Sequence, residues 1–227
     1  MTTRNWPRPR FAVIPTTGRV CLKDCLQAIE PQVDDALLIW APRYEAEEDW
    51  EHAPPDGHLI AGVGIEEQRN ISRWWNVGID YAKQEALKLG VTAWDIAILN
   101  DDVIVPDEWF TTLSNRMRGM NVAATSMGPV TLPILHTKPG TTRLDHRMAG
   151  FAFMLAGELG VRADETLQWW CGDNDIDMQS RLKGGTVILP DTGVRHLYPD
   201  QTTVGELAAR TAVDMQRFVD KWGFRPW

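Results

Sequence analysis

An apolar run of sequence ends abruptly on a cluster of side-chain oxygens. Residues 95–99 are mostly apolar, and Asn100, Asp101 and Asp102 follow directly. A run of this length is typical of a buried strand, and in an open α/β sheet ligands bind at the carboxyl ends of the strands. Mg²⁺ and Mn²⁺ prefer oxygen ligands, and Mg²⁺ is commonly held by carboxylates together with substrate phosphates. The segment predicts a site for a metal-bound phosphate, although Asn-Asp-Asp is also ordinary turn chemistry.

A second acidic segment lies far along the chain and contains Asp173, Asp175 and Asp177. A carboxylate here could take a proton from an attacking hydroxyl while the first cluster holds a cation. The same acids would also suit the solvated first turn of a helix, because they complement the helix dipole and cap free N–H groups. On this segment alone, both interpretations stay open.

The order of apolar patterns predicts the elements that must position these residues. In the first half, strand-like runs at residues 11–15, 36–40, 59–63 and 95–99 alternate with helical spacing at residues 21–29, 66–89 and 106–118. Parallel strands need long crossover connections, so this alternation predicts an α/β fold with a mainly parallel sheet covered by helices on both faces. For the second half we expect strands at residues 121–125, 150–155 and 186–190, helices at residues 173–183 and 203–222, and a loop at residues 128–140.

Composition limits the classes of protein that the chain could represent. The 227 residues carry 23 basic and 31 acidic side chains, with a net charge of −8 and no long block of one sign, which disfavours nucleic acid as a passive partner. Cys21, Cys25 and Cys171 are too few for a disulfide framework, and Cys21 and Cys25 are interpreted as small buried hydrophobes. Because no apolar run approaches 18 residues and the start lacks a signal-peptide core, we expect a cytoplasmic protein with no membrane partner.

Two stretches of the first half resemble GT-A glycosyltransferases similar to family 2. The apolar run that leads into Pro15-Thr16-Thr17-Gly18-Arg19 resembles the opening strand of that family, and Asn76-Val77-Gly78-Ile79 resembles its Asn-x-Gly-Ile motif. The family has an Arg immediately before this Asn, where the present chain has Trp75, and Arg73 is a candidate to take over that charge. The resemblance implies that the nucleotide is contacted by Pro15, Thr16, Arg19, Arg73, Asn76 and Gly78.

The two acidic segments and a late histidine extend the resemblance. The segment that ends at Asp102 is similar to the family's Asp-x-Asp (DxD) motif, with Asn100 at its first position. It implies that Asn100 faces the ribose, that Asp101 is the intervening residue at the nucleotide, and that Asp102 holds Mn²⁺ or Mg²⁺. Val194-Arg195-His196 resembles the family's late histidine, which implies that His196 completes the metal shell.

The second acidic segment resembles the family's Glu-Asp-x-Asp motif, which is followed by an Arg and a Gly. Aligned on the spacing from Asp177 to Arg181, it implies that Asp175 is the catalytic base. Asp173 remains a rival, because Asn174 stands where the family has Glu.

Two neighbouring groups of side chains have open interpretations. Trp169 and Trp170, which precede the acidic segment, could be core aromatics, or one of them could stack on a sugar face. Arg143, His146 and Arg147 could form a solvated turn or could hold a diphosphate or an acceptor.

The resemblance spans residues 11–222 and implies one GT-A domain over residues 1–227. Residues 11–120 would form the half that binds the nucleotide-sugar, and residues 121–227 the acceptor-binding half with a C-terminal helix. The implied reaction is a metal-dependent transfer of a sugar, with inversion, from a nucleotide-sugar (a UDP-sugar is favoured) to an acceptor hydroxyl. A protein, a small molecule, a glycan and a modified DNA base all stay open as acceptors, as does the oligomeric state. A nucleotidyltransferase of similar fold and a non-catalytic nucleotide-sugar-binding module are the alternatives.

Overall fold

A mixed sheet forms the centre of the computed structural model, which describes residues 7–16, 18–40, 59–62, 70–191, 193–198 and 205–227. In the described chain this sheet has eight strands in the order β3-β2-β1-β4-β8-β6-β9-β7. The first four to appear in the chain run parallel to one another: β1 (Arg10–Thr16), β2 (Asp35–Trp40), β3 (Leu59–Gly62) and β4 (Asp95–Leu99).

The second half of the chain completes the same sheet with mixed directions. Its strands are β6 (Ala124–Gly128), β7 (Ile134–His136), β8 (Ala152–Ala156) and β9 (Thr186–Pro190). Strand β8 is antiparallel to both β4 and β6, β9 is parallel to β6, and β7 is antiparallel to β9. Outside this sheet, β5 (Val103–Ile104) and β10 (Arg195–His196) form a short antiparallel pair.

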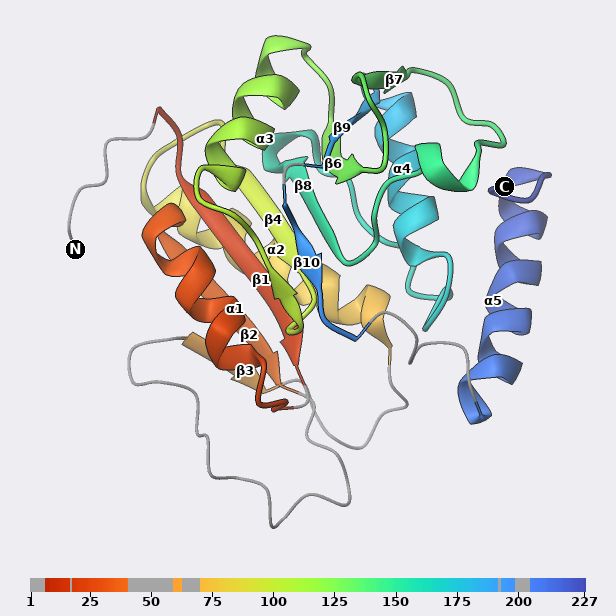
Figure 1. Cartoon of the computed structure of the whole chain (residues 1–227), viewed down its shortest axis with the longest axis horizontal. Coiled ribbons are helices and arrows are strands. Elements are labelled where there is room, and N and C mark those ends of the chain that lie inside the picture. Colours follow the sequence, from red (N-terminus) through yellow and green to blue (C-terminus); the bar gives the residue numbers. More distant parts are fainter. Residues whose placement is uncertain (1–6, 17, 41–58, 63–69, 192, 199–204) are drawn as a thin grey trace.

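Helices cover both faces of the sheet, as Figure 1 shows. The five α-helices of the described residues are α1 (Leu22–Ile29), α2 (Ile71–Lys88), α3 (Trp109–Gly119), α4 (Gly172–Leu182) and α5 (Glu206–Trp222). Short 3-10 turns lie at Glu30–Gln32, Leu144–His146 and Gly157–Leu159. Because side chains alternate along β1, Ala12 and Ile14 pack in the core beneath α1 and α3, whereas Phe11 and Val13 pack beneath α2. The predicted α/β fold class is thereby confirmed.

The last helix packs against α4 at the right-hand edge of Figure 1 rather than on the first half of the sheet. Its buried Phe218 joins a small separate core with Leu167, Cys171 and Met178. This third core ties α5 to α4 and to the segment that leads into α4.

Several predicted boundaries differ from the observed ones. The strand expected at residues 121–125 begins only at Ala124, because Asn121 adopts a left-handed backbone and the Val122 N–H returns to the Met117 carbonyl to end α3. The loop expected at residues 128–140 contains the short strand β7. For the helices expected from residues 66 and 203, the starts lie outside the described residues, and α2 is capped at Asn70, whose side chain accepts from the Arg73 N–H.

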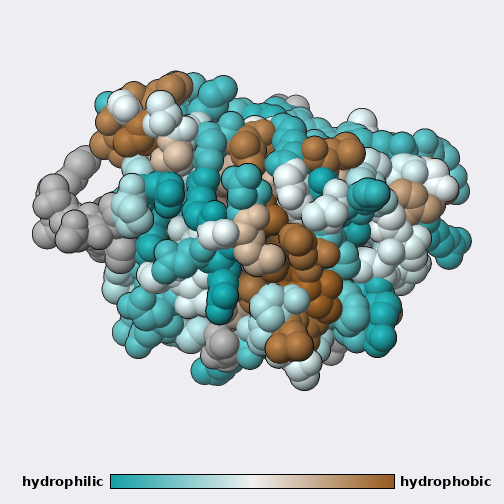
Figure 2. Space-filling model, turned by 90° about the horizontal axis from the view of Figure 1, so that it is seen from above, coloured by the Kyte–Doolittle hydropathy of each residue, from teal (hydrophilic) through white to brown (hydrophobic). Residues whose placement is uncertain are grey.

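The β7 edge of the sheet carries exposed apolar side chains. Leu132 is 73% exposed and Leu135 is 47% exposed. In the view from above, Figure 2 shows hydrophobic side chains gathered in the middle of the face and surrounded by polar ones. Strand β7 has three residues and follows Pro133, and both features limit pairing with a strand of another chain. Among the described helices, none combines the length and the apolar character needed to cross a membrane.

Candidate active site

The ends of the neighbouring strands β1 and β4 bring four polar side chains together. The Thr16 hydroxyl donates to Asp101 Oδ2 at 2.8 Å. Arg19 joins both carboxylates, with Nη2 at 2.6 Å from Asp101 Oδ1 and Nη1 at 2.9 Å from Asp102 Oδ2. Both aspartates are buried. The parallel pairing of β1 with β4 places these residues at one edge of the sheet, where the strand pattern predicted a site.

The β5–β10 pair brings His196 to the same place. His196 lies opposite Val103 in this pair, and the Leu197 N–H donates to the Asp102 carbonyl at 2.9 Å. The imidazole stacks on Phe151 with ring centroids 4.4 Å apart. Its Nε2 lies 3.3 Å from Asp102 Oδ1, but the contact lacks hydrogen-bond geometry, and Oδ1 is a buried oxygen with no donor among the described residues.

The chemistry of Asp102 and His196 fits a divalent cation. Burial alone would raise the pKa of Asp102, but the neighbouring His196 and the Arg19 guanidinium lower it below its usual value, so the carboxylate is ionised at neutral pH. An ionised carboxylate oxygen without a donor, beside an imidazole nitrogen, is a ligand pair that suits Mn²⁺. No group of three or more His, Cys, Asp or Glu residues in the described part of the chain forms a complete metal site. Two protein ligands would leave positions for substrate phosphates and water.

Asp101 differs from its neighbour in charge environment. Burial raises the pKa of Asp101, and the Arg19 charge and the Thr16 hydroxyl bond oppose the rise without cancelling it. Its two oxygens are both engaged, one by Thr16 and one by Arg19. Asp101 therefore holds Arg19 and the end of β1 in place and leaves Asp102 as the residue with an open oxygen.

A cleft of 330 Å³ lies beside this cluster and meets it at His196. Aromatic and apolar groups form most of its wall, and a few polar groups converge on it, which is the usual composition of a ligand site. The lining residues are Ile71, Trp75, Asn100, Arg147, Gly150, Phe151, Trp169, Trp170, Cys171, Gly172, Asp173, Asn174 and His196.

Asp173 is the carboxylate that the described residues present to this cleft. It lies in the first turn of α4, and a Cβ at Gly150 would overlap its carboxylate, so only glycine permits this approach. Burial raises the pKa of Asp173, and the nearby Arg147 charge opposes the rise. A carboxylate with a raised pKa in a cleft is suited to accept a proton in a reaction.

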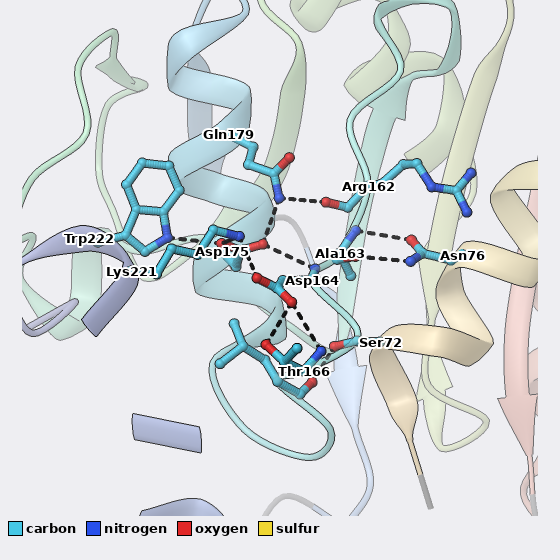
Figure 3. Close-up of polar contacts among 11 residues, drawn as sticks. Ser72, Asn76, Arg162, Ala163, Asp164, Thr166, Asp175, Gln179, Lys221 and Trp222 are labelled. Carbon is cyan, nitrogen blue, oxygen red and sulfur yellow. Dashed lines mark hydrogen bonds and ion pairs between the residues drawn. The ribbon is translucent and has the colours of Figure 1, made fainter. Parts of the chain in front are cut away.

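Asp175 has a different environment, which Figure 3 shows. Its side chain is fully buried and accepts from the Asp164 N–H at 3.1 Å, Gln179 Nε2 at 2.6 Å and Trp222 Nε1 at 2.8 Å. Lys221 Nζ lies 2.7 Å from the same carboxylate. Residues two apart on a helix point to roughly opposite sides, at about 200°. Asp175 therefore faces α5 and is not among the described residues that line the cleft.

The third acid of the segment also has a structural environment. Asp177 is buried and forms a bidentate ion pair with Arg181, with contacts of 3.0 and 2.7 Å. The spacing used to align the acidic segment thus belongs to an ion pair within α4. It carries no information about which acid faces the cleft.

Two predicted nucleotide contacts occupy packing positions away from the cleft lining. Asn76 is buried, and its amide donates to the Ala163 carbonyl at 2.9 Å and to Glu165, while its oxygen accepts from the Ala163 N–H at 3.0 Å. A Cβ at Gly78 would overlap Val13, so this glycine lets α2 pack closely on β1. The structure thus uses Asn76 to hold a loop and Gly78 to close the core.

The remaining predicted nucleotide contacts are divided between the cleft and its surroundings. Asn100 lines the cleft, and Pro15 is buried in β1 next to Thr16. Arg73 lies in the first turn of α2 and is not among the cleft-lining residues.

One functional feature was missed by sequence reasoning. Asp214 of α5 is buried, and its Oδ2 accepts from the N–H groups of Trp169 at 2.6 Å and Trp170 at 2.9 Å, which fixes the two cleft-lining tryptophans. Asp214 lies four residues before Phe218 and eight before Trp222, on the apolar face of α5. An acid on the apolar face of a helix is the signal that could have found it.

Comparisons with known proteins place the fold. No protein-family profile and no curated protein matches the sequence. Two solved structures of S. aureus TarS are similar to the chain, each at 10% identity. For the structure of TarS 1-349 the TM-score is 0.54, and the match covers 82% of this chain and 59% of the TarS chain. For a second TarS structure the TM-score is 0.56, and the match covers 96% of this chain and 44% of the TarS chain.

The chain thus spans less than two thirds of the length of either TarS structure. The similarity supports a GT-A-like glycosyltransferase fold. At 10% identity the similarity is evidence for the fold alone, and the function has to be argued from the site.

Proposed function

We propose that this protein is a glycosyltransferase that moves a sugar from a nucleotide-sugar to an acceptor hydroxyl. One observation carries the proposal: His196, the partner of Asp102, and Asp173 line the same cleft, so a cation-holding pair and a base meet at one substrate site. The two groups come from sequence-distant segments, and the transfer requires both of them.

The Asp102 and His196 side would receive the diphosphate of the donor. These two residues would hold Mn²⁺ or Mg²⁺, which when bound would neutralise charge that develops on the leaving diphosphate. Arg19 adds a fixed positive charge next to them, and Asn100 offers an amide at the cleft wall. This end of the cleft would therefore hold the nucleotide, and a UDP-sugar stays the favoured donor.

Asp173 would act as the base in place of Asp175. It would accept the proton of the acceptor hydroxyl as the hydroxyl oxygen attacks the anomeric carbon and the bond to the diphosphate breaks. Among the described cleft-lining residues it is the single carboxylate, which supports one displacement with inversion rather than two displacements through a covalent intermediate. A general base works best when its pKa lies near the pH of the reaction, and burial raises the pKa of Asp173 in that direction.

A donor panel tests the proposal before any acceptor is known. The full chain with Mn²⁺ would be mixed with UDP-, GDP-, CMP- and dTDP-sugars, with thermal shift and slow donor hydrolysis as readouts. We expect one base type to raise the melting temperature in a metal-dependent manner and to be hydrolysed to the nucleoside phosphate and free sugar. Release of pyrophosphate from a nucleoside triphosphate would instead identify a nucleotidyltransferase. Tight binding of a nucleotide-sugar without turnover in the presence of an acceptor library would identify a binding module.

A further inference from the structure

Arg147 presents a cation to the cleft from the segment that precedes β8. Its guanidinium carbon lies over the Trp227 ring, 4.5 Å from the ring centroid. Arg147 lines the same cleft as Asp173. Contact with an aromatic face uses the π surface of a guanidinium and leaves the N–H donors at its edge for a carboxylate or phosphate.

Three distant segments hold this cation in place. The Thr142 N–H donates to the Pro226 carbonyl at 2.9 Å, which brings the last residues of the chain back to the loop before Arg147. The Trp227 ring then meets Trp170 edge to face, with centroids 6.5 Å apart. The Trp170 N–H is itself fixed by Asp214. The position of Arg147 is thus determined by the tertiary structure and not by its own loop alone.

Arg147 forms no close ion pair with a carboxylate of the described residues, although its charge acts on the carboxylate of Asp173. The nearby Arg143 pairs with Asp145 at 2.9 Å, and Arg217 pairs with Asp214 at 3.1 Å. For Arg147, the structure gives no carboxylate within 4.0 Å in the ranges that it describes. A cation held on an aromatic ring at a cleft wall, without a close ion pair, is suited to bind an anionic group of a ligand.

The location of Arg147 favours the acceptor over the donor. The donor diphosphate already has a proposed site in the cluster of Arg19, Asp102 and His196. Arg147 lies on the side of the proposed base, since its charge acts on the Asp173 carboxylate. An anionic group bound to Arg147 would lie beside the hydroxyl that Asp173 deprotonates.

We propose that Arg147, supported by Trp227, binds a phosphate or carboxylate of the acceptor, close to the hydroxyl that receives the sugar. This inference rests on the proposed function and narrows it to acceptors of one chemical class. Neutral alcohols and neutral sugars would be poor acceptors.

Small anionic alcohols serve as probes of this subsite. Glycerol 1-phosphate and glucuronate would be compared with glycerol and glucose by ligand-observed NMR on the full chain, with UDP and Mg²⁺ at saturation to fill the donor end. We expect the two anionic probes to bind and the two neutral ones not to bind. Comparison of the affinities for glycerol 1-phosphate and glucuronate also shows whether the site prefers a phosphate or a carboxylate.

Variants of the same region provide the controls. Arg147→Gln should weaken binding of the preferred anionic probe about tenfold or more, because a charge-assisted hydrogen bond is lost. Arg147→Lys should recover part of the affinity, since the charge returns without the bidentate geometry. Trp227→Leu should also weaken binding, whereas Arg143→Gln, which changes an exposed and already paired arginine, should not. Melting curves of each variant verify the fold.

Two results would overturn the proposal. One is equal affinity of the wild type and Arg147→Gln for the anionic probes. The other is that the probes bind to the chain without UDP and are displaced when UDP is added, which would assign Arg147 to the donor. If the wild type fails to bind UDP but binds the probes through Arg147, the anion site is supported and the transferase function is rejected.

Discussion

Lys221 Nζ lies 2.7 Å from Asp175 Oδ1, in an ion pair that joins α5 to α4 where the carboxylate is fully buried. Lys221 also contacts Asp164 at 2.8 Å, and the neighbouring Trp222 indole donates to Asp175. Figure 3 shows these contacts together with those of Asp164 and Thr166. This relationship gives Asp175 a structural environment between α4 and α5, and it is the reason that the proposed base is Asp173.

Replacement of Asp175 should act first on stability. Asp175→Asn removes the negative charge that Lys221 faces and puts an amide N–H₂ among donors, so we expect a loss of about 2–4 kcal/mol in the free energy of unfolding. Urea unfolding of the full chain measures it. Asp220→Asn is the matched control, because Asp220 lies on α5 next to Lys221 and makes an exposed contact with Gln216. Unchanged stability with lost donor hydrolysis would return the base role to Asp175.

Replacement of Asp173 should act on the reaction and not on the fold. For Asp173→Asn we expect the rate of donor hydrolysis to fall by about 10²–10⁴-fold while the Kd for the nucleotide-sugar changes little. Steady-state kinetics and calorimetry separate the two effects. Asp24→Asn, an exposed acid in the first turn of α1, should leave both unchanged. Full hydrolytic activity of Asp173→Asn would exclude it as the base.

The pH profile should report the Asp173 carboxylate. Its pKa is raised by burial, and a base works only when ionised, so kcat/KM for donor hydrolysis should fall as the pH drops through this raised pKa, above the usual range for Asp. Because the Arg147 charge lowers the pKa of Asp173, Arg147→Gln should move the acid limb of the profile to higher pH. A limb that moves to lower pH, or that stays in place, would contradict the electrostatic assignment.

The proposed cation site can be tested without catalysis. Asp102→Asn removes the ionised oxygen that has no donor, and we expect the affinity for Mn²⁺ to fall by more than about a hundredfold. His196→Gln should also weaken binding. Electron paramagnetic resonance of free Mn²⁺, in the presence of UDP, measures both. The exposed Asp107→Asn serves as the control, and wild-type affinity in Asp102→Asn would reject this ligand assignment.

Substitution of Gly78 tests whether this glycine of α2 serves core packing or nucleotide binding. Gly78→Ala should destabilise the fold by about 1–3 kcal/mol, because the new Cβ overlaps Val13, and should leave the Kd for UDP of the folded protein unchanged. Val13→Ala makes room, so the double variant should be less destabilised than the sum of the two single ones. Denaturant unfolding of the four proteins gives this coupling. Intact stability with weakened UDP binding would support the nucleotide contact that the motif implied.

The sequence by itself determined the fold class and the place where the two carboxylates of Asp101 and Asp102 gather at a strand end. The alternation of strand and helix patterns reflects which side chains are buried. It therefore predicted the parallel strands β1, β2, β3 and β4 and the helices α1, α2 and α3 of the described residues. The run of residues 95–99 marked a strand end, and the strand end placed Asp101 and Asp102 at the edge where Thr16 and Arg19 meet them.

Only the tertiary structure decided which polar residues face the cleft. Asp173 and Asp175 are two positions apart, and the side on which α5 packs determines that Asp175 is enclosed between two helices whereas Asp173 lines the cleft. Likewise, the Trp227 ring positions Arg147, and the Asp214 carboxylate positions Trp170. Periodicity records burial along one element, whereas these contacts join segments that are far apart in sequence, and no local pattern encodes them.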